Sequence, residues 1–143
     1  MTQANDDTEI KHILTRTKVI ALVGYSEKPA RASHQVAAFL ADKGYRVIPV
    51  NPGQAGKKAL GETIVASLAD IPASAGVDMV DIFRRSDAVE PVVEAALEHL
   101  PDLKTVWMQL GVENEAARAM ARAQGVDVVM NRCPKIEYPR LIG

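Results

Sequence analysis

Residues 19–26 read Val-Ile-Ala-Leu-Val-Gly-Tyr-Ser, a continuous apolar run that ends in a glycine. The run has the length of a strand, and its lack of alternation indicates a strand covered on both faces of a sheet. Four similar runs, rich in β-branched residues, follow along the chain. The five predicted strands cover residues 19–23, 47–50, 77–83, 105–108 and 126–130.

Apolar residues at helical spacing separate most of these runs. The first stripe, over residues 36–40, ends at Lys43 and Gly44, and Asn114 is a candidate N-cap. The predicted helices cover 9–15, 36–42, 91–100 and 115–124. Residues 53–76 are poor in helix, with a short edge strand expected over 63–65 and a helical turn over 67–70. Residues 131–137 are expected to form the loop that leaves the last strand.

Alternating strands and helices with short connections predict a parallel, doubly wound sheet with right-handed crossovers. The sequence therefore favours a Rossmann-like α/β fold with five main strands and helices on both faces. Its 143 residues are the length of one domain, so residues 1–143 are assigned to a single domain. Residues 1–7 are expected to be flexible.

The composition is that of a soluble protein, with 48% hydrophobic and 24% charged residues. The 17 Lys and Arg nearly cancel the 18 Asp and Glu, and the net charge of -1 disfavours nucleic acid and membrane surfaces as partners. A polar N-terminus and the lack of an apolar run of about 20 residues lead us to expect a cytoplasmic protein. One cysteine and three histidines predict neither a disulfide framework nor a metal site.

Basic residues gather in the loops that leave the predicted strands. In a doubly wound sheet these loops share one edge, where ligands bind. The eight residues are Lys28, Arg31, Lys57, Lys58, Arg84, Arg85, Arg132 and Lys135. Scattered surface charge is the alternative explanation. Together with a helix N-terminus near 30–33, whose free N–H groups attract anions, the pattern favours a polyphosphate ligand.

The usual nucleotide motifs do not fit the chain. The first strand exit has one glycine, Gly24, where a dinucleotide fingerprint has three, and Asn51 follows the second strand where an acidic residue would bind the ribose. No Walker A loop is present, and Asp81 lacks the acidic partners of a phosphoacceptor site. NAD binding, ATP hydrolysis and phosphoacceptor chemistry are therefore disfavoured.

Five blocks in register resemble the single-domain coenzyme A-binding proteins, which are similar to the N-terminal CoA-binding domain of the succinyl-CoA synthetase α subunit. These blocks are Val-Ile-Ala-Leu-Val-Gly-Tyr-Ser (19–26), Val-Ile-Pro-Val-Asn-Pro (47–52), Asp-Ile-Phe-Arg-Arg (81–85), Trp-Met-Gln-Leu-Gly (107–111) and Met-Asn-Arg-Cys-Pro-Lys-Ile-Glu (130–137). The resemblance runs from about residue 8 to the C-terminus.

The resemblance implies a role for each block. Residues of the first strand exit and helix start would hold the CoA diphosphate, and they are Gly24, Tyr25, Ser26, Arg31 and Ser33. Asn51 and Pro52 would line the adenosine side. Phe83 and Arg84 would flank the adenine or the start of the pantetheine arm, which Gln109, Leu110 and Gly111 would guide. Lys28 and Lys57 join the candidate set as basic residues of the same loops, while Gln54 stands where the synthetase has a nucleotide-binding lysine.

No pair of carboxylates, and no nucleophile with a base, is placed together by the predicted elements. None of the three histidines matches the phosphorylated histidine of the synthetase. We therefore expect non-catalytic binding of coenzyme A or an acyl-CoA. An enzyme or enzyme subunit acting on a CoA thioester, and a binder of another nucleotide or a protein-interaction module, remain open.

Five other positions carry narrower expectations. Cys133 is expected to be a small buried residue, with a thiol close to the CoA sulfhydryl as the alternative. Trp107 is expected in the core. His34, at the start of the first crossover helix, is expected to cap or lie at the surface, or else to contact phosphate. Arg132 and Glu137 are expected to form an ion pair at the loop edge.

Overall fold

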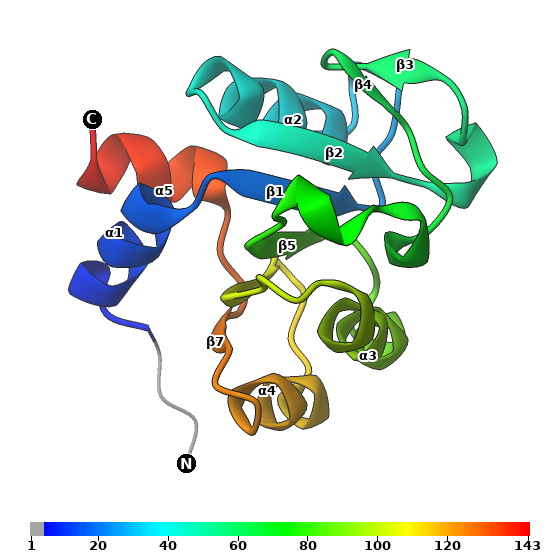
Figure 1. Ribbon diagram of the computed structural model, residues 1–143. Helices are drawn as coiled ribbons and strands as arrows, with labels where there is room; N and C mark the ends of the chain where they lie inside the picture. The colour runs from blue at the N-terminus through cyan, green and yellow to red at the C-terminus, as the bar shows by residue number, and fades with distance from the viewer. Residues whose placement is uncertain (1–4) are drawn as a thin grey trace.

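Five parallel strands form the central sheet of the computed structural model, which describes residues 5–143 (Figure 1). The strands are β1 (Val19–Val23), β2 (Arg46–Val50), β5 (Met79–Ile82), β6 (Thr105–Met108) and β7 (Asp127–Val129). Their order across the sheet is β2-β1-β5-β6-β7, and every pair is parallel. The doubly wound, Rossmann-like α/β fold is therefore confirmed, and several strands are shorter than the apolar runs that predicted them.

Helices cover both faces of the sheet, as Figure 1 shows. On one face lie α1 (Asp7–Arg16), α2 (Ala32–Asp42) and α5 (Pro134–Leu141), and on the other lie α3 (Val89–His99) and α4 (Glu115–Arg122). Two helices begin at capping side chains, because Asp6 accepts from Glu9 N at 2.8 Å and Asn114 accepts from Ala117 N at 2.9 Å. Of the N-terminal residues expected to be flexible, 1–4 lie outside the described residues.

Helix α5 corrects the prediction that residues 131–137 form a loop, because the helix begins at Pro134. Pro134 occupies the first turn, where a missing N–H costs nothing, and Cys133 is the N-cap residue. Pro139, inside the helix, obscured the helical pattern in the sequence, because proline there removes a backbone donor. Tyr138 packs edge-on against Phe39 and Tyr45, with ring centroids 5.9 and 6.2 Å away, and this tertiary contact holds the helix on the sheet.

The helix-poor segment forms a small hairpin and several short 3-10 turns. Strands β3 (Lys58–Ala59) and β4 (Glu62–Thr63) pair antiparallel in a separate two-stranded sheet, so the edge strand predicted over 63–65 overlaps the observed strand only at Thr63. Val65 still reaches the main sheet through a parallel bridge to Val50. The 3-10 turns are Pro52–Gln54, Leu68–Asp70, Ala73–Ala75 and Ser86–Ala88. The turn predicted over 67–70 is confirmed, with Ser67 at its N-cap.

The sheet is buried on both faces, which explains its continuous apolar runs. Trp107, fully buried on the α1–α2–α5 face, is a core residue as predicted, and its Nε1 donates to Arg132 O at 2.8 Å. Val80 and Ile82 face the α3–α4 side. None of the helices within residues 5–143 is long and apolar enough to cross a membrane.

The order of the strands reverses between β1 and β5, where the chain exits at Gly24 and Phe83. Gly24 has a φ of 89°, and a Cβ there would lie 2.2 Å from Phe83 O. Only glycine allows the two strand exits to approach this closely. In such sheets ligands bind outside the carboxyl ends of the strands at this reversal point.

Candidate functional site

Three cavities surround the exits of β1, β5 and β6. The α2 cavity, of about 450 Å³, lies between the β1 exit and the start of α2. The α3 cavity, of about 210 Å³, lies between the β2 exit and α3. The α5 cavity, of about 420 Å³, lies near Leu110 and the residue before α5. Phe83 lines the α2 and α5 cavities, and Arg84 lines the α3 and α5 cavities, so the three are neighbours.

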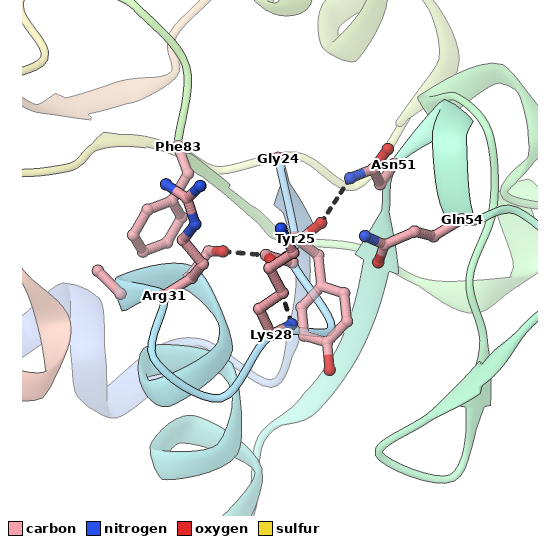
Figure 2. Close-up of a pocket in the computed structure, with 10 residues that line it drawn as sticks. Gly24, Tyr25, Lys28, Arg31, Asn51, Gln54 and Phe83 are labelled. Carbon is pink, nitrogen blue, oxygen red and sulfur yellow. Dashed lines mark hydrogen bonds between the residues drawn. The ribbon is translucent and has the colours of Figure 1, made fainter.

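The loop after β1 is held by hydrogen bonds on both sides of the α2 cavity. Ser26 N donates to Ser33 Oγ at 3.0 Å, and Lys28 N donates to Ser26 Oγ at 3.2 Å. On the β2 side, Asn51 Nδ2 donates to Tyr25 O at 2.7 Å. Figure 2 shows these bonds. The loop is therefore pre-organised around the cavity by side chains from α2 and from the β2 exit.

The Tyr25 and His34 side chains pack against each other and support this loop. The Tyr25 ring is buried and lies against the His34 ring at 5.8 Å between centroids. His34 Nδ1 lies 3.1 Å from Ser26 O and 3.3 Å from Tyr25 Oη. Burial raises the pKa of the Tyr25 phenol, and the nearby Glu27 carboxylate adds to this shift. His34 therefore braces the loop through Ser26 and Tyr25, both of which line the cavity.

The α2 cavity is electropositive. Helix α2 begins after Arg31 with no side-chain cap among the described residues, so its first N–H groups are available to an anion. Lys28 and Arg31 line the cavity, and neither has a carboxylate within 4 Å in residues 5–143. Figure 2 shows Arg31 on the Phe83 side and Gln54 on the opposite side, beside Asn51.

Other basic residues of the predicted set are bound within the protein. Lys57 Nζ forms an ion pair with Glu27 at 2.9 Å, and Lys58 Nζ donates to Thr63 Oγ1 at 2.6 Å. Arg85 pairs with Asp87 at 3.2 Å. The expected pair of Arg132 with Glu137 is present at 3.5 Å, and the Glu137 side chain is buried. Of the remaining basic residues of the set, Lys28, Arg31 and Arg84 line cavities without an ion pair among residues 5–143, and Lys135 is exposed outside the three cavities.

The α3 cavity is apolar and is formed by elements far apart in the sequence. Val23 and Val50 come from the sheet, Pro52 from the β2 exit, and Arg84 from the β5 exit. The remaining wall consists of residues 66–68 and the face of α3 that carries Pro91, Val92 and Ala95. A flat apolar ligand group fits such a space, with a guanidinium at its side.

The α5 cavity is lined mainly by apolar side chains around the β6 exit. Phe83, Leu110 and Cys133 form part of its wall, and Leu110 is 56% exposed. The turn that carries Leu110 is fixed, because Gly111 N donates to Asn131 Oδ1 at 2.7 Å and Asn131 N donates to Val112 O at 3.2 Å. The Cys133 thiol is buried, as expected for a small core residue.

Most of the predicted site residues line these cavities. In the α2 cavity lie Gly24, Tyr25, Ser26, Lys28, Arg31, Ser33, Asn51 and Phe83. The other two cavities add Pro52, Arg84, Gln109 and Leu110. Lys57 and Gly111 line none of the three. Gln54 also lines the α2 cavity but lies outside the predicted set, although its position beside the β2 exit pointed to it. The wall formed by 66–68 and α3 was not predicted either.

With this geometry established, comparison with known proteins defines the class. Residues 18–139 match the family model described as "CoA binding domain", and the chain belongs to that family. Among residues 5–143, no group of three or more His, Cys, Asp or Glu is placed to hold a metal ion. The family match over residues 18–139 confirms the resemblance that the five sequence blocks indicated.

Individual relatives match nearly the whole chain. "Uncharacterized protein YneT" of Bacillus subtilis (strain 168) is 42% identical over 130 residues, which is 91% of this chain and 92% of that protein. A solved structure titled "hypothetical protein from Pyrococcus horikoshii OT3" is 37% identical, covers 100% of this chain and 99% of that one, and has a TM-score of 0.88. "The structure of cell-free ID.343 from Thermus thermophilus" is 34% identical, covers 96% and 100%, and also has a TM-score of 0.88.

Proposed function

We propose that this protein binds coenzyme A or an acyl-CoA in the cytoplasm without transforming it. The observation that carries the proposal is the placement of three neighbouring cavities at the strand reversal point. One is electropositive, one is small and apolar, and one is lined mainly by apolar side chains, among them the exposed Leu110. Coenzyme A combines a diphosphate, an adenosine and a pantetheine arm, and each part suits one of these cavities.

The diphosphate would occupy the α2 cavity. Its oxygens would accept hydrogen bonds from backbone N–H groups at the start of α2, where the helix dipole favours negative charge. Lys28 and Arg31, with no carboxylate within 4 Å among residues 5–143, would add charge-assisted hydrogen bonds. Lys28 is also better placed than Lys57 to meet a further phosphate, because Lys57 is paired with Glu27.

The adenosine and the pantetheine would leave the diphosphate in opposite directions. The adenine would enter the α3 cavity between Pro52 and the apolar face of α3, with Arg84 beside it. The pantetheine would pass Phe83, which lines both the α2 and α5 cavities, and would reach Gln109 and Leu110. Phe83 and Arg84 thus lie where the two arms diverge, which agrees with the roles that the family resemblance implies for them.

A ligand panel tests the proposal by thermal unfolding with CoA, acetyl-CoA, NAD and ATP. CoA at 100 times its dissociation constant stabilises a protein by about 2.7 kcal/mol. For a domain of this size that corresponds to a rise in Tm of about 8 °C. We expect CoA and acetyl-CoA to raise Tm by this order, and NAD and ATP to raise it much less. Equal shifts for all four ligands, or no shift with CoA, would contradict the proposal.

A matched pair of arginine variants locates the site. Arg31→Ala removes a cation from the α2 cavity, and Arg122→Ala removes an exposed cation at the end of α4. We expect Arg31→Ala to weaken CoA binding by about tenfold, the loss of one charge-assisted hydrogen bond, and Arg122→Ala to change it by less than about twofold. Isothermal titration calorimetry measures both values.

A further inference from the structure

The buried carboxyl group of Asp81 contacts Gln109, a residue that lines the α5 cavity. The proposed function assigns this cavity, the pantetheine groove, to the pantetheine arm. Asp81, in β5, has no exposed surface, and it faces the same side of the sheet as Met79 and Trp107. With the amide nitrogen of Gln109 turned toward it, Nε2 lies 3.0 Å from Asp81 Oδ1 and 3.2 Å from Oδ2. This is the amide orientation that satisfies the hydrogen bonds of both groups.

The position of Asp81 is costly for the fold. A carboxyl group loses its hydration in the middle of a parallel sheet, and burial raises the pKa of Asp81 well above its ordinary value. The neighbouring residues of β5, Met79, Val80 and Ile82, are all apolar and buried. An apolar residue at position 81 would satisfy the core equally well, so packing alone does not explain the carboxyl group.

The hydrogen-bond partner of Asp81, Gln109, explains the buried carboxyl group better. Gln109 is 4% exposed, follows the last residue of β6, and lines the α5 cavity together with Phe83 and Leu110. Its backbone is fixed as well, because Gln109 N donates to Ile82 O at 3.3 Å and Val112 N donates to Gln109 O at 2.8 Å. The Asp81 carboxyl therefore fixes the side chain of a residue whose main chain the strand and the turn already hold.

We infer that Asp81 is a positioning residue for the pantetheine groove, acting through Gln109. By accepting from Nε2 it sets which end of the Gln109 amide faces the rest of the cavity wall, and so sets the hydrogen-bonding character of that wall. This inference rests on the proposed function. It predicts that the loss of Asp81 weakens binding of the pantetheine arm and leaves binding of the adenosine diphosphate part unchanged.

The test compares CoA with ADP, which contains the adenosine and diphosphate but no pantetheine. In Asp81→Ala we expect the affinity for CoA to fall by about tenfold, the effect of one lost hydrogen bond, and the affinity for ADP to change by less than about twofold. The matched control is Asp78→Ala, at the other end of β5, where the carboxylate accepts from Lys18 N and Val19 N. That variant should be less stable than the wild type but should keep the wild-type ratio of CoA to ADP affinity.

If Asp81→Ala does not fold, a second set of variants exchanges the donor and acceptor roles of residues 81 and 109; the double variant is called the reversed pair. Gln109→Glu alone places two carboxyl groups side by side and should lower the CoA to ADP affinity ratio. Adding Asp81→Asn restores a donor and acceptor pair with the roles exchanged, and should recover that ratio. Equal losses for CoA and ADP in Asp81→Ala, or no recovery in the reversed pair, would overturn the inference. Absence of CoA binding to the wild type would instead refute the proposed function.

Discussion

At the amino edge of the sheet, where the strands begin, several polar side chains are bound to partners within the protein, whereas at the carboxyl edge two cations that line a cavity have no carboxylate partner among residues 5–143. Asp78 accepts from two backbone N–H groups, and Arg16 binds Asp127 and Thr105, each at 2.8 Å. At the carboxyl edge, Lys28 and Arg31 have no carboxylate within 4 Å in residues 5–143. The comparison separates polar groups that stabilise the fold from those available to a ligand.

The largest expected effect is the loss of stability caused by adding a single methyl group at the carboxyl edge. In Gly24→Ala the new Cβ would lie 2.2 Å from Phe83 O, on a backbone with a φ of 89°. Strain and overpacking together should lower the free energy of unfolding by about 4 kcal/mol or more. Gly125, after α4 at the amino edge, has a φ of 78° but open space around its Cβ position. Gly125→Ala should therefore cost only about 1–2 kcal/mol.

Urea unfolding of the two glycine variants measures this difference. The strand exits at the carboxyl edge are in close contact, and the turn at the amino edge is not, so the difference between the variants should exceed about 2 kcal/mol. Equal losses would show that backbone conformation, and not the approach of β1 to β5, explains the glycine at position 24.

A pH dependence of about 2–3 kcal/mol is expected from the amino edge. Burial raises the pKa of the Tyr45 phenol to about 12, helped by Tyr138 and Asp78, and its hydroxyl donates to Leu14 O. Because the unfolded phenol loses its proton near pH 10 and the folded one near pH 12, the unfolded state binds fewer protons between these values. Stability contributed by Tyr45 is therefore present below pH 10 and is lost as pH rises to 12.

Tyr45→Phe isolates this contribution, because it keeps the ring and removes the titrating group. We expect the free energy of unfolding of the wild type to fall more steeply between pH 9 and pH 11 than that of the variant, as measured by urea titrations. Parallel curves would mean that the phenol titrates normally. CoA binding at pH 7 should be the same in both proteins, because Tyr45 lies at the opposite edge from the cavities.

Replacing one arginine at each edge of the sheet with alanine should separate effects on CoA binding from effects on stability. Arg84→Ala, at the meeting point of the α3 and α5 cavities, should weaken CoA binding by about fivefold and change stability by less than about 0.5 kcal/mol. Arg16→Ala should lower stability by about 1–2 kcal/mol, because it leaves the buried Thr105 hydroxyl without this donor. Calorimetric titration and thermal unfolding of each variant give both values. A loss of CoA affinity in Arg16→Ala would remove the distinction between the edges.

The sequence predicts the sheet well because its strands are buried on both faces and therefore appear as continuous apolar runs. It predicts α5 poorly because Pro139 interrupts the helical pattern and because packing of Tyr138, which the sequence does not show, stabilises that helix. The hairpin of β3 and β4 has only two residues in each strand, too few for a period to be visible.

Some features of the candidate site could likewise be predicted from the sequence, and others could not. Gly24 and the β1 exit could be predicted, because a glycine after a buried strand and before a helix is a local signal. The pairing of Lys57 with Glu27 depends on two loops meeting in space, which the sequence does not show. The role of Asp81 depends on a neighbouring strand, since Gln109 is 28 residues away in the sequence yet touches its carboxyl group.

The smallest expected effect concerns Cys133, whose thiol forms part of the α5 cavity wall but is only 6% exposed. Because a thiolate must reach a disulfide to exchange with it, we expect CoA disulfide to leave the folded protein unmodified while it modifies the unfolded chain. Cys133→Ser should change CoA affinity by less than about twofold. Intact mass measurement decides the point, since a CoA-sized adduct on the folded wild type that is lost in Cys133→Ser would place this thiol at the end of the pantetheine groove.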